Sequence, residues 1–307
     1  MLLRRMLVPL VALAAALSLA ACSSTPKATG GGSGASKPTI TIGATNFEEQ
    51  EIVANLYGDV LKHAGFTVKV EPALGTRAVV VPAIEHGQID LEPDYAASLL
   101  GFLHGGNPQP AGDQITTAVA ADNTALAPYG VTVLPASKAL DTNVFAVTKA
   151  TATKDHLTTI SSLAQYASKM TLGGPPECPT FAGCQPGLQS VYGLKFAGFK
   201  SLDEAGPLSV AALKSGEVQV VELFSSDGNV VSNNFVALTD DKHLEGADYI
   251  VPVVRKSVNS AALRSALARL NNALTTDAIS TLNLDVTVQK QQPAAVAETW
   301  LKANHLI

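Results

Sequence analysis

Apolar runs alternate with amphipathic stretches along most of the chain from residue 39 onward. Residues 39–45 (TITIGAT) are typical of a buried strand, and residues 48–64 carry apolar side chains at helical spacing. Gly65 is well placed to end that helix. The apolar face of the predicted helix consists of Ile52, Val53, Leu56, Val60 and Leu61.

The same alternation continues through the next segments. Residues 66–73 (FTVKVEPA) predict another strand, and a helix over residues 77–87 leads into residues 89–95 (IDLEPDY). Strands that alternate with helices in this way indicate an α/β fold with mainly parallel sheets.

Two segments share one pattern. Residues 83–98 and residues 212–227 each contain a helix end, a glycine, a short strand and then an acidic or aromatic stretch. In open α/β sheets, ligands bind at the carboxyl edge of the strands, where these stretches would emerge. The pattern predicts two similar lobes that face one cleft, and the alternative is a chance match between common α/β turns.

The chain is expected to cross between the lobes twice. Residues 142–150 (TNVFAVTKA) predict a crossing strand, and residues 235–256 would bring the chain back. The C-terminal tail then supplies helices to the first lobe, one around residues 260–274 and one that starts at Pro293 and carries Trp300 as a packing residue. The first of these has its leucines at three- and four-residue spacing, at Leu263, Leu267, Leu270 and Leu274.

The N-terminus has the features of an export signal. Arg4 and Arg5 precede an apolar run, Met6–Ala21, that is too short to span a bilayer comfortably. The sequence Leu-Ala-Ala-Cys that ends at Cys22 resembles the lipobox of bacterial lipoproteins, which implies that Cys22 carries a lipid. The alternative is an ordinary signal peptide with an incidental cysteine.

Composition then limits the classes of function. Residues 23–38 are mostly Gly, Ser, Thr and Pro and predict a flexible tether. Removal of residues 1–21, which hold two arginines and no acid, changes the formal net charge from −5 to −7. An acidic chain gives no support to nucleic-acid binding. A hydrophobic content of 47% allows substantial cores.

No set of residues in the sequence indicates catalysis, a metal or a cofactor. The six histidines lie far apart and none has metal-ligand spacing. Neither a G-x-S-x-G sequence nor an S-x-x-K sequence with its partner motifs is present. Acidic pairs such as Glu48-Glu49 are more typical of solvated helix ends, so we expect a protein that is not an enzyme.

Cys178 and Cys184 lie six positions apart in a segment rich in proline. A metal site, a redox pair and a disulfide are the possible interpretations. The spacing is weak for zinc without a second pair or a histidine, and it is not Cys-x-x-Cys. In an exported chain a disulfide is favoured, and it would make one loop rigid.

Several segments taken together resemble the substrate-binding lipoproteins of glycine betaine/choline (osmoprotectant) ABC importers. The resemblance covers nearly all of the chain from Thr39 to the C-terminus and rests on NFEEQEIVANLYGDVLKHAGF, HGQIDLEPDY, GGPPECPTFAGCQPGLQSVYGLKF, ELFSSDGNVV and ALTDDKHL…VPVVR. It implies an α/β, two-lobed periplasmic-binding-protein fold of the type II kind, with the ligand cleft between the lobes.

The resemblance also implies a ligand and a set of binding residues. Members of this family surround the quaternary ammonium group of the ligand with aromatic rings. Polar groups of the protein bind the carboxylate or hydroxyl of the same ligand. Matched position by position, the implied binding residues are Asn46, Phe47, Tyr95, Asp141, Asn143, Phe224, Ser226, Asp227 and Tyr249. The other tyrosines, Tyr57, Tyr129, Tyr166 and Tyr192, are assigned to packing.

Three positions depart from the family pattern. Asn143 stands where a full aromatic box has tyrosine, and the Ser225-Ser226 pair replaces a threonine before Asp227. Phe181 stands where an arginine is expected. Arg77 is therefore the substitute candidate for binding the ligand carboxylate.

These observations predict an extracytoplasmic solute-binding component of an ABC importer, monomeric, attached to the membrane only by its lipid and delivering its solute to permease subunits. The alternatives are a binding protein for an amino acid or a polyol, an enzyme that uses the same cleft, and an adhesin or structural lipoprotein. The hinge is expected near residues 141–147 and 236–250. The predicted boundaries are a signal peptide at 1–21, a lipidated tether at 22–38, lobe 1 at 39–141 and 247–307, and lobe 2 at 142–246.

Overall fold

The computed structural model of the protein describes residues 39–105, 115–203, 205–246 and 248–307. These residues belong to one compact unit, Lys37–Ile307. The predicted signal peptide, Cys22 and the tether lie outside the described residues. Within the described ranges, no helix has the length and apolar character that crossing a membrane requires.

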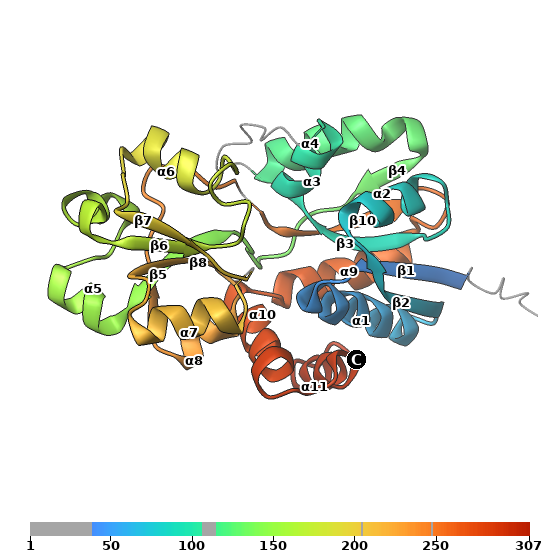
Figure 1. Cartoon of the computed structure of the whole chain (residues 1–307). Coiled ribbons are helices and arrows are strands. Elements are labelled where there is room, and N and C mark those ends of the chain that lie inside the picture. The colour runs from blue at the N-terminus through green and yellow to red at the C-terminus, as the bar shows by residue number, and fades with distance from the viewer. Residues whose placement is uncertain (1–38, 106–114, 204, 247) are drawn as a thin grey trace, which may run out of the picture. The chain divides into compact units, whose positions relative to one another are not determined.

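Five strands form the first sheet, and they come from both ends of the described chain (Figure 1). They are β1 (Thr39–Thr45), β2 (Thr67–Gly75), β3 (Leu91–Tyr95), β4 (Val131–Val133) and β10 (Ile250–Arg255). Their order in the sheet is β2-β1-β3-β10-β4. Strand β1 is parallel to β2 and β3, whereas β10 is antiparallel to both β3 and β4.

The second sheet also has five strands, all from the middle of the chain. They are β5 (Asn143–Thr148), β6 (Thr171–Gly174), β7 (Gly198–Ser201), β8 (Val220–Phe224) and β9 (Phe235–Ala237). Their order is β7-β6-β8-β5-β9, with β6 parallel to β7 and β8 and β5 antiparallel to β8 and β9.

The two sheets have the same topology, which agrees with the repeat seen in the sequence. In each, three parallel strands are followed by one antiparallel strand that arrives from the other part of the chain and then by a short edge strand. The two-lobed α/β fold predicted from the sequence is confirmed. Where the chain passes between the sheets, Leu140 and Tyr249 form an isolated antiparallel bridge.

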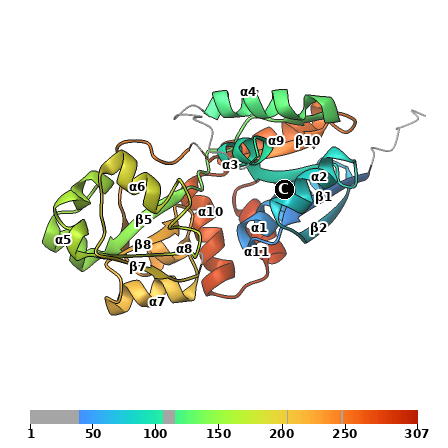
Figure 2. The ribbon, with the colours of Figure 1, turned by 45° about the horizontal axis from the view of Figure 1, so that its top comes forward.

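Helices cover both faces of the first sheet (Figure 2). The predicted helix that begins at Glu48 is present and ends at His63, and Gly65 follows it with a φ of 82°. The predicted tail helices are present as well. The helices of this lobe are α1 (Glu48–His63), α2 (Arg77–Glu85), α3 (Ala96–Leu103), α4 (Ile115–Leu126), η1 (Ala127–Tyr129), α9 (Ala261–Ala273), α10 (Thr276–Asn283), the π-helical η4 (Leu284–Val288) and α11 (Pro293–Ala303).

Strand β10 shows how the first lobe builds two cores. Its side chains point to opposite faces in turn. Ile250 and Val254 join a core with α1, α9, α10 and α11, while Val251 and Val253 join a second core with α2, α3 and α4. Because both faces of the sheet are covered at this position, β10 consists of nearly continuous apolar residues.

The second lobe follows the same plan with shorter helices. Phe145 and Val147 face a core that contains α6, whereas Ala146 faces α7. The helices of this lobe are α5 (Lys149–Asp155), η2 (Ile160–Gln165), η3 (Ala167–Lys169), α6 (Gln185–Tyr192), α7 (Pro207–Ser215) and α8 (Gly228–Ser232).

Three of the four tyrosines assigned to packing are buried or half-buried, and Trp300 packs against the first core. The assignment is wrong for Tyr129, whose side chain is 49% exposed. Tyr129 is the last residue of η1, and the turn at Gly130 that follows leaves its ring at the surface.

The first lobe contains one fully buried acidic side chain on α4. Asp122 on α4 is fully buried, and neither of its oxygens has a hydrogen-bond partner in the described part of the chain. Burial raises the pKa of Asp122 to about 8, and the charges of Asp94 and Asp248 add to the rise. Asp122 is therefore protonated in the folded protein at neutral pH.

This burial predicts a pH-dependent stability. A carboxyl group whose pKa is higher in the folded state stabilises fully below its unfolded pKa and loses that contribution as pH rises towards the folded value. Relative to Asp122→Asn, the wild type should lose roughly 2–5 kcal/mol of unfolding free energy between pH 4 and pH 8. Urea denaturation at several pH values measures this difference, and the exposed Asp277→Asn variant is the control. A constant difference across the range would contradict the prediction.

Candidate functional site

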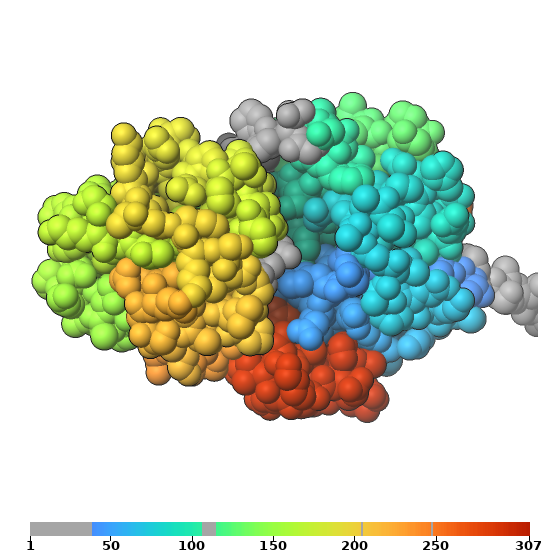
Figure 3. Space-filling model, in the orientation of Figure 1, coloured from blue at the N-terminus to red at the C-terminus, as the bar shows by residue number. Residues whose placement is uncertain are grey.

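A cleft of about 960 Å³ lies between the two lobes. Three segments line it, namely residues 46–49 at the start of α1, residues 205–229 around α7 and β8, and residues 283–290. Figure 3 shows these segments, coloured blue, yellow to orange and red, meeting on one face of the protein. The volume of the cleft suits a small organic ligand.

The carboxyl ends of β1 and β8, one strand from each sheet, supply residues to the cleft lining. Asn46 and Phe47 follow β1, and Phe224, Ser226 and Asp227 end or follow β8. The rings of Phe47 and Phe224, one from each lobe, meet edge to face with centroids 5.7 Å apart and an interplanar angle of 67°. Five of the residues implied by the resemblance therefore line the cleft.

One of the residues in the cleft lining is a buried carboxylate. Glu49, the second residue of α1, is 1% exposed. Its Oε1 accepts a hydrogen bond from the Tyr95 hydroxyl at 2.8 Å, and its Oε2 accepts one from Asn283 Nδ2 at 2.6 Å. Burial raises the pKa of Glu49, and these hydrogen bonds oppose the rise because they favour the charged form.

Asn283 and Ser226 connect this carboxylate to the second lobe. Asn283 Nδ2 also donates to the Ser226 carbonyl at 3.0 Å, and Ser226 Oγ donates to Asp141 Oδ1 at 2.7 Å. Asp141 is 7% exposed, and burial together with the charge of Glu49 raises its pKa. Tyr95 and Asp141, both implied as binding residues, therefore lie behind the cleft wall and support Glu49 and Ser226.

Asp227 presents one oxygen that no described residue satisfies. Its Oδ1 caps α8 by accepting from the Asn229 amide at 2.8 Å, while its buried Oδ2 has no hydrogen-bond partner among the described residues. Burial raises the pKa of Asp227, and the bonds from Asn229 oppose the rise. A carboxylate among the residues of a cleft lining is suited to a cationic ligand.

The structure places Arg77 differently from the expected ligand clamp. Its Nη2 donates to Asp94 Oδ1 at 2.8 Å and its Nε to the same oxygen at 3.0 Å. Arg77 is not among the residues that line the cleft. Asp94 on β3 lies beside the start of α2. The Arg77 guanidinium is therefore already hydrogen-bonded to a carboxylate of the protein itself.

The remaining implied binding residues lie near the crossing between the lobes. Asn143 begins β5 opposite Phe224, and its side chain hydrogen-bonds Glu245. Tyr249 pairs with Leu140, and its carbonyl accepts from the Ala96 amide at 3.2 Å. Neither lines the cleft.

Glu49, Gln50 and Asn283 belong to the surroundings of the cleft but were not among the residues predicted from the sequence. Gln50 is 1% exposed and hydrogen-bonds the Tyr95 side chain. The acidic pair Glu48-Glu49 looked like a solvated helix start, and only Glu48 is exposed. Glu49 and Gln50 are adjacent in the sequence and come soon after the loop that follows β1. An acid next to a glutamine at this position was the signal that could have located these two residues.

Close backbone contact also joins the lobes beside the site. A Cβ added to Gly228 at the start of α8 would lie 2.6 Å from Leu284 Cα and 2.7 Å from Leu284 N. Only glycine allows η4 to approach α8 so closely, and Asn283 is thereby held within reach of Ser226.

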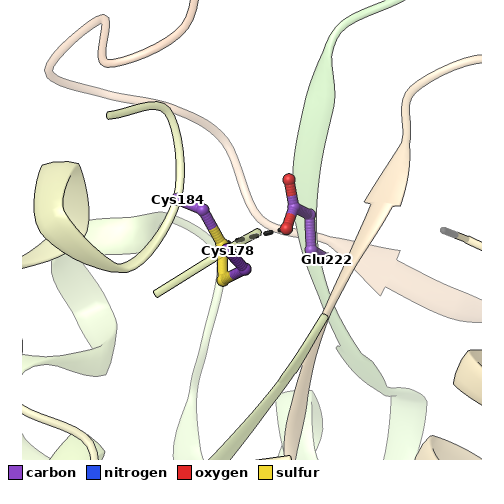
Figure 4. A group of neighbouring side chains, drawn as sticks. All are labelled: Cys178, Cys184 and Glu222. Carbon is purple, nitrogen blue, oxygen red and sulfur yellow. Dashed lines mark hydrogen bonds between the residues drawn. A yellow bond between two sulfur atoms is a disulfide. The ribbon is translucent and has the colours of Figure 1, made fainter. Parts of the chain in front are cut away.

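Cys178 and Cys184 are joined by a disulfide, with their Cα atoms 5.1 Å apart. Both are fully buried in the second lobe, where they join its core. Glu222 on β8 lies beside them, with its Oε2 2.9 Å from Cys184 Sγ (Figure 4).

The fold and the cleft define a solute-binding protein of the two-lobed kind. Residues 38–303 match the family model described as the substrate-binding domain of the ABC-type glycine betaine transport system. The chain belongs to this family of extracytoplasmic solute-binding proteins of ABC importers, which is not a family of enzymes.

Individual relatives agree with this assignment. The chain is 26% identical to a glycine-betaine-binding protein of Pseudomonas aeruginosa over 88% of this chain and 89% of that protein. It is 24% identical to the carnitine transport binding protein OpuCC of Listeria monocytogenes, with 89% of each chain covered. A crystal structure of a glycine betaine/carnitine/choline ABC transporter protein has the same fold, with a TM-score of 0.79 and 23% identity over 88% of this chain and 99% of that one.

The site makes a prediction about Asn283. Asn283→Ala removes the donor that Glu49 Oε2 and the Ser226 carbonyl share, so it should lower the unfolding free energy by about 1–3 kcal/mol. Because that bond favours ionised Glu49, the loss should be larger at pH 8 than at pH 4, where the protonated acid needs no such donor. Denaturation at both pH values measures the effect. Asn304→Ala, which removes an exposed local bond, is the control, and equal losses at both pH values would contradict the prediction.

Proposed function

We propose that the protein captures a small solute with a quaternary ammonium group, glycine betaine first and choline next, and delivers it to an ABC permease. The observation that carries this proposal is the pair of Phe47 and Phe224 rings, one from each lobe, in the lining of the cleft. Family membership supports the same ligand class.

The chemistry of the wall suits a methylated cation. A cation over an aromatic face gains about 2 kcal/mol or more once it is desolvated. A quaternary ammonium group cannot donate hydrogen bonds, so it needs rings and nearby negative charge. Asp227 lines the same cleft as the two rings, and its carboxylate supplies that charge.

A zwitterionic ligand also needs a positive group for its carboxylate. With Arg77 bound to Asp94, the cationic residues on the described cleft wall are Lys214 and Lys290. We propose these lysines, with Asn46, as the carboxylate-binding side of the cleft. Tyr95, Asp141, Asn143 and Tyr249 remain proposed binding residues that act from behind the wall or after movement of the lobes.

Calorimetric titration tests the ligand class. Phe47→Ala and Phe224→Ala should each weaken binding of glycine betaine or choline by about 1–2 kcal/mol, or roughly five- to thirtyfold, because each removes one face of the cation site. Tyr129→Ala is the control, since its exposed ring lies outside the cleft lining and its loss should leave affinity unchanged.

The titration also separates this proposal from its alternatives. An absence of binding to glycine betaine, choline and carnitine at millimolar concentration would reject the ligand class. Tight binding of an amino acid or a polyol without a methylated nitrogen would assign the cleft to a different solute.

We also propose that the protein acts as a monomer held at the membrane by a lipid on Cys22, with residues 23–38 as a tether. Cys22 follows an apolar run and small residues, as a lipobox requires. Cys22→Ser should release the protein from the cell envelope into the soluble fraction, because no lipid would be attached, while solute affinity stays unchanged. Fractionation followed by titration measures both, and a variant that remains membrane-bound would contradict the anchor.

A further inference from the structure

The loop that carries the disulfide has features that solute binding does not use. The Sγ atoms of Cys178 and Cys184 and a carboxylate oxygen of Glu222 all lie within 4.8 Å of one another. The two cysteines are fully buried and Glu222 is 6% exposed. Figure 4 shows the Glu222 carboxylate, on the neighbouring strand, directed at the disulfide.

The surroundings are shaped to hold these groups together. A Cβ added to Gly174 would lie 3.0 Å from Glu222 Oε2 and 3.3 Å from Cys178 Sγ, so the absence of a side chain there makes room for the cluster. Glu245 reaches the same loop, since a Cβ on Gly183 would lie 3.1 Å from its Oε2. Its buried Oε1 has no hydrogen-bond partner among the described residues.

A carboxylate cannot accept a hydrogen bond from a disulfide, but it is a good ligand for a metal ion. Disulfide sulfurs carry no hydrogen to donate and bind metals weakly. Two thiolates and a carboxylate, in contrast, are ligands that zinc prefers, at about 2.3 Å for sulfur and 2.0–2.2 Å for oxygen. A tetrahedral zinc ion places two such sulfurs roughly 3.8 Å apart, which fits donor atoms grouped within 4.8 Å.

We propose that Cys178, Cys184 and Glu222 form a zinc site that exists only when the disulfide is reduced. A dithiol reductant transfers two electrons and two protons to the cysteines and closes to its own disulfide. Zinc then replaces the two thiol protons, which are released to solvent, and Glu222 supplies the third ligand. A water molecule or Glu245 completes the tetrahedron.

The disulfide and the metal ion are therefore alternative cross-links of the same loop. Either one ties Cys178 to Cys184 and keeps residues 179–183 folded against the second lobe. The oxidised protein excludes zinc because its sulfurs are bonded to each other, and the reduced protein regains a cross-link only when zinc is present.

The test uses purified protein in a Cys22→Ser background, so that the pair provides the only thiols of the chain. The protein is reduced without oxygen, freed of reductant and titrated with cadmium, whose thiolate bonds absorb in the ultraviolet, and with zinc by calorimetry. The reduced protein should bind one ion per chain and gain thermal stability. The oxidised protein and the Cys178→Ser/Cys184→Ser variant should do neither.

The Glu222→Gln variant tests whether Glu222 is a ligand of the metal or only lies near the two cysteines. It keeps both cysteines and the shape of the side chain but removes the anionic ligand. Because loss of even an outer partner of a metal site costs roughly ten- to a hundredfold in affinity, this variant should weaken cadmium binding at least tenfold. Glu177→Gln, at the exposed residue next to Cys178, should change it less than twofold.

Two results would overturn the proposal. One is reduced protein that binds no more metal than the double-serine variant, and the other is Glu222→Gln with unchanged affinity. Circular dichroism of each variant, together with its binding of solute, shows that it is folded before its metal affinity is compared.

Discussion

The buried Glu49 carboxylate constrains how the parts of the site are arranged. A carboxylate that is 1% exposed must be hydrogen-bonded, since leaving it unpaired would cost several kcal/mol. Its partners are Tyr95, at the end of β3, and Asn283, at the end of α10. Because Asn283 also donates to the Ser226 carbonyl, one hydrogen-bonded carboxyl group connects α1, β3, α10 and the β8 edge of the other lobe.

This arrangement makes the cleft wall two layers deep. The residues that line the cleft, such as Phe47 and Asp227, come from loops at strand ends and depend on groups behind them for position. Tyr95 and Asp141 belong to that second layer in the described conformation. Substitutions in either layer should therefore affect solute binding, the outer ones by contact and the inner ones by position.

The sequence predicted most of the strands and the longer helices because their apolar periodicity is local. The family resemblance also pointed to Phe47, Phe224, Ser226 and Asp227, which the structure places after β1 and at or after the end of β8, in the cleft lining. The sequence could not show that Arg77 is bound to Asp94, nor that Asn283 reaches Glu49 across 234 positions. Such pairings depend on how distant segments pack, and polar residues on a short helix such as α10 carry no periodic signal of their own.

The position of β10 in the first sheet has a consequence for how the chain reaches its native state. Strand β4 pairs with β10 and with no other strand of that sheet, yet 116 residues, 134–249, separate the two in sequence. The second sheet is complete at Ala237, before β10 is reached. When the chain is synthesised from its N-terminus, the second lobe can therefore be completed first. The first lobe still lacks β10, the antiparallel strand between β3 and β4, at that time. The lobe that begins the protein is the one that closes last.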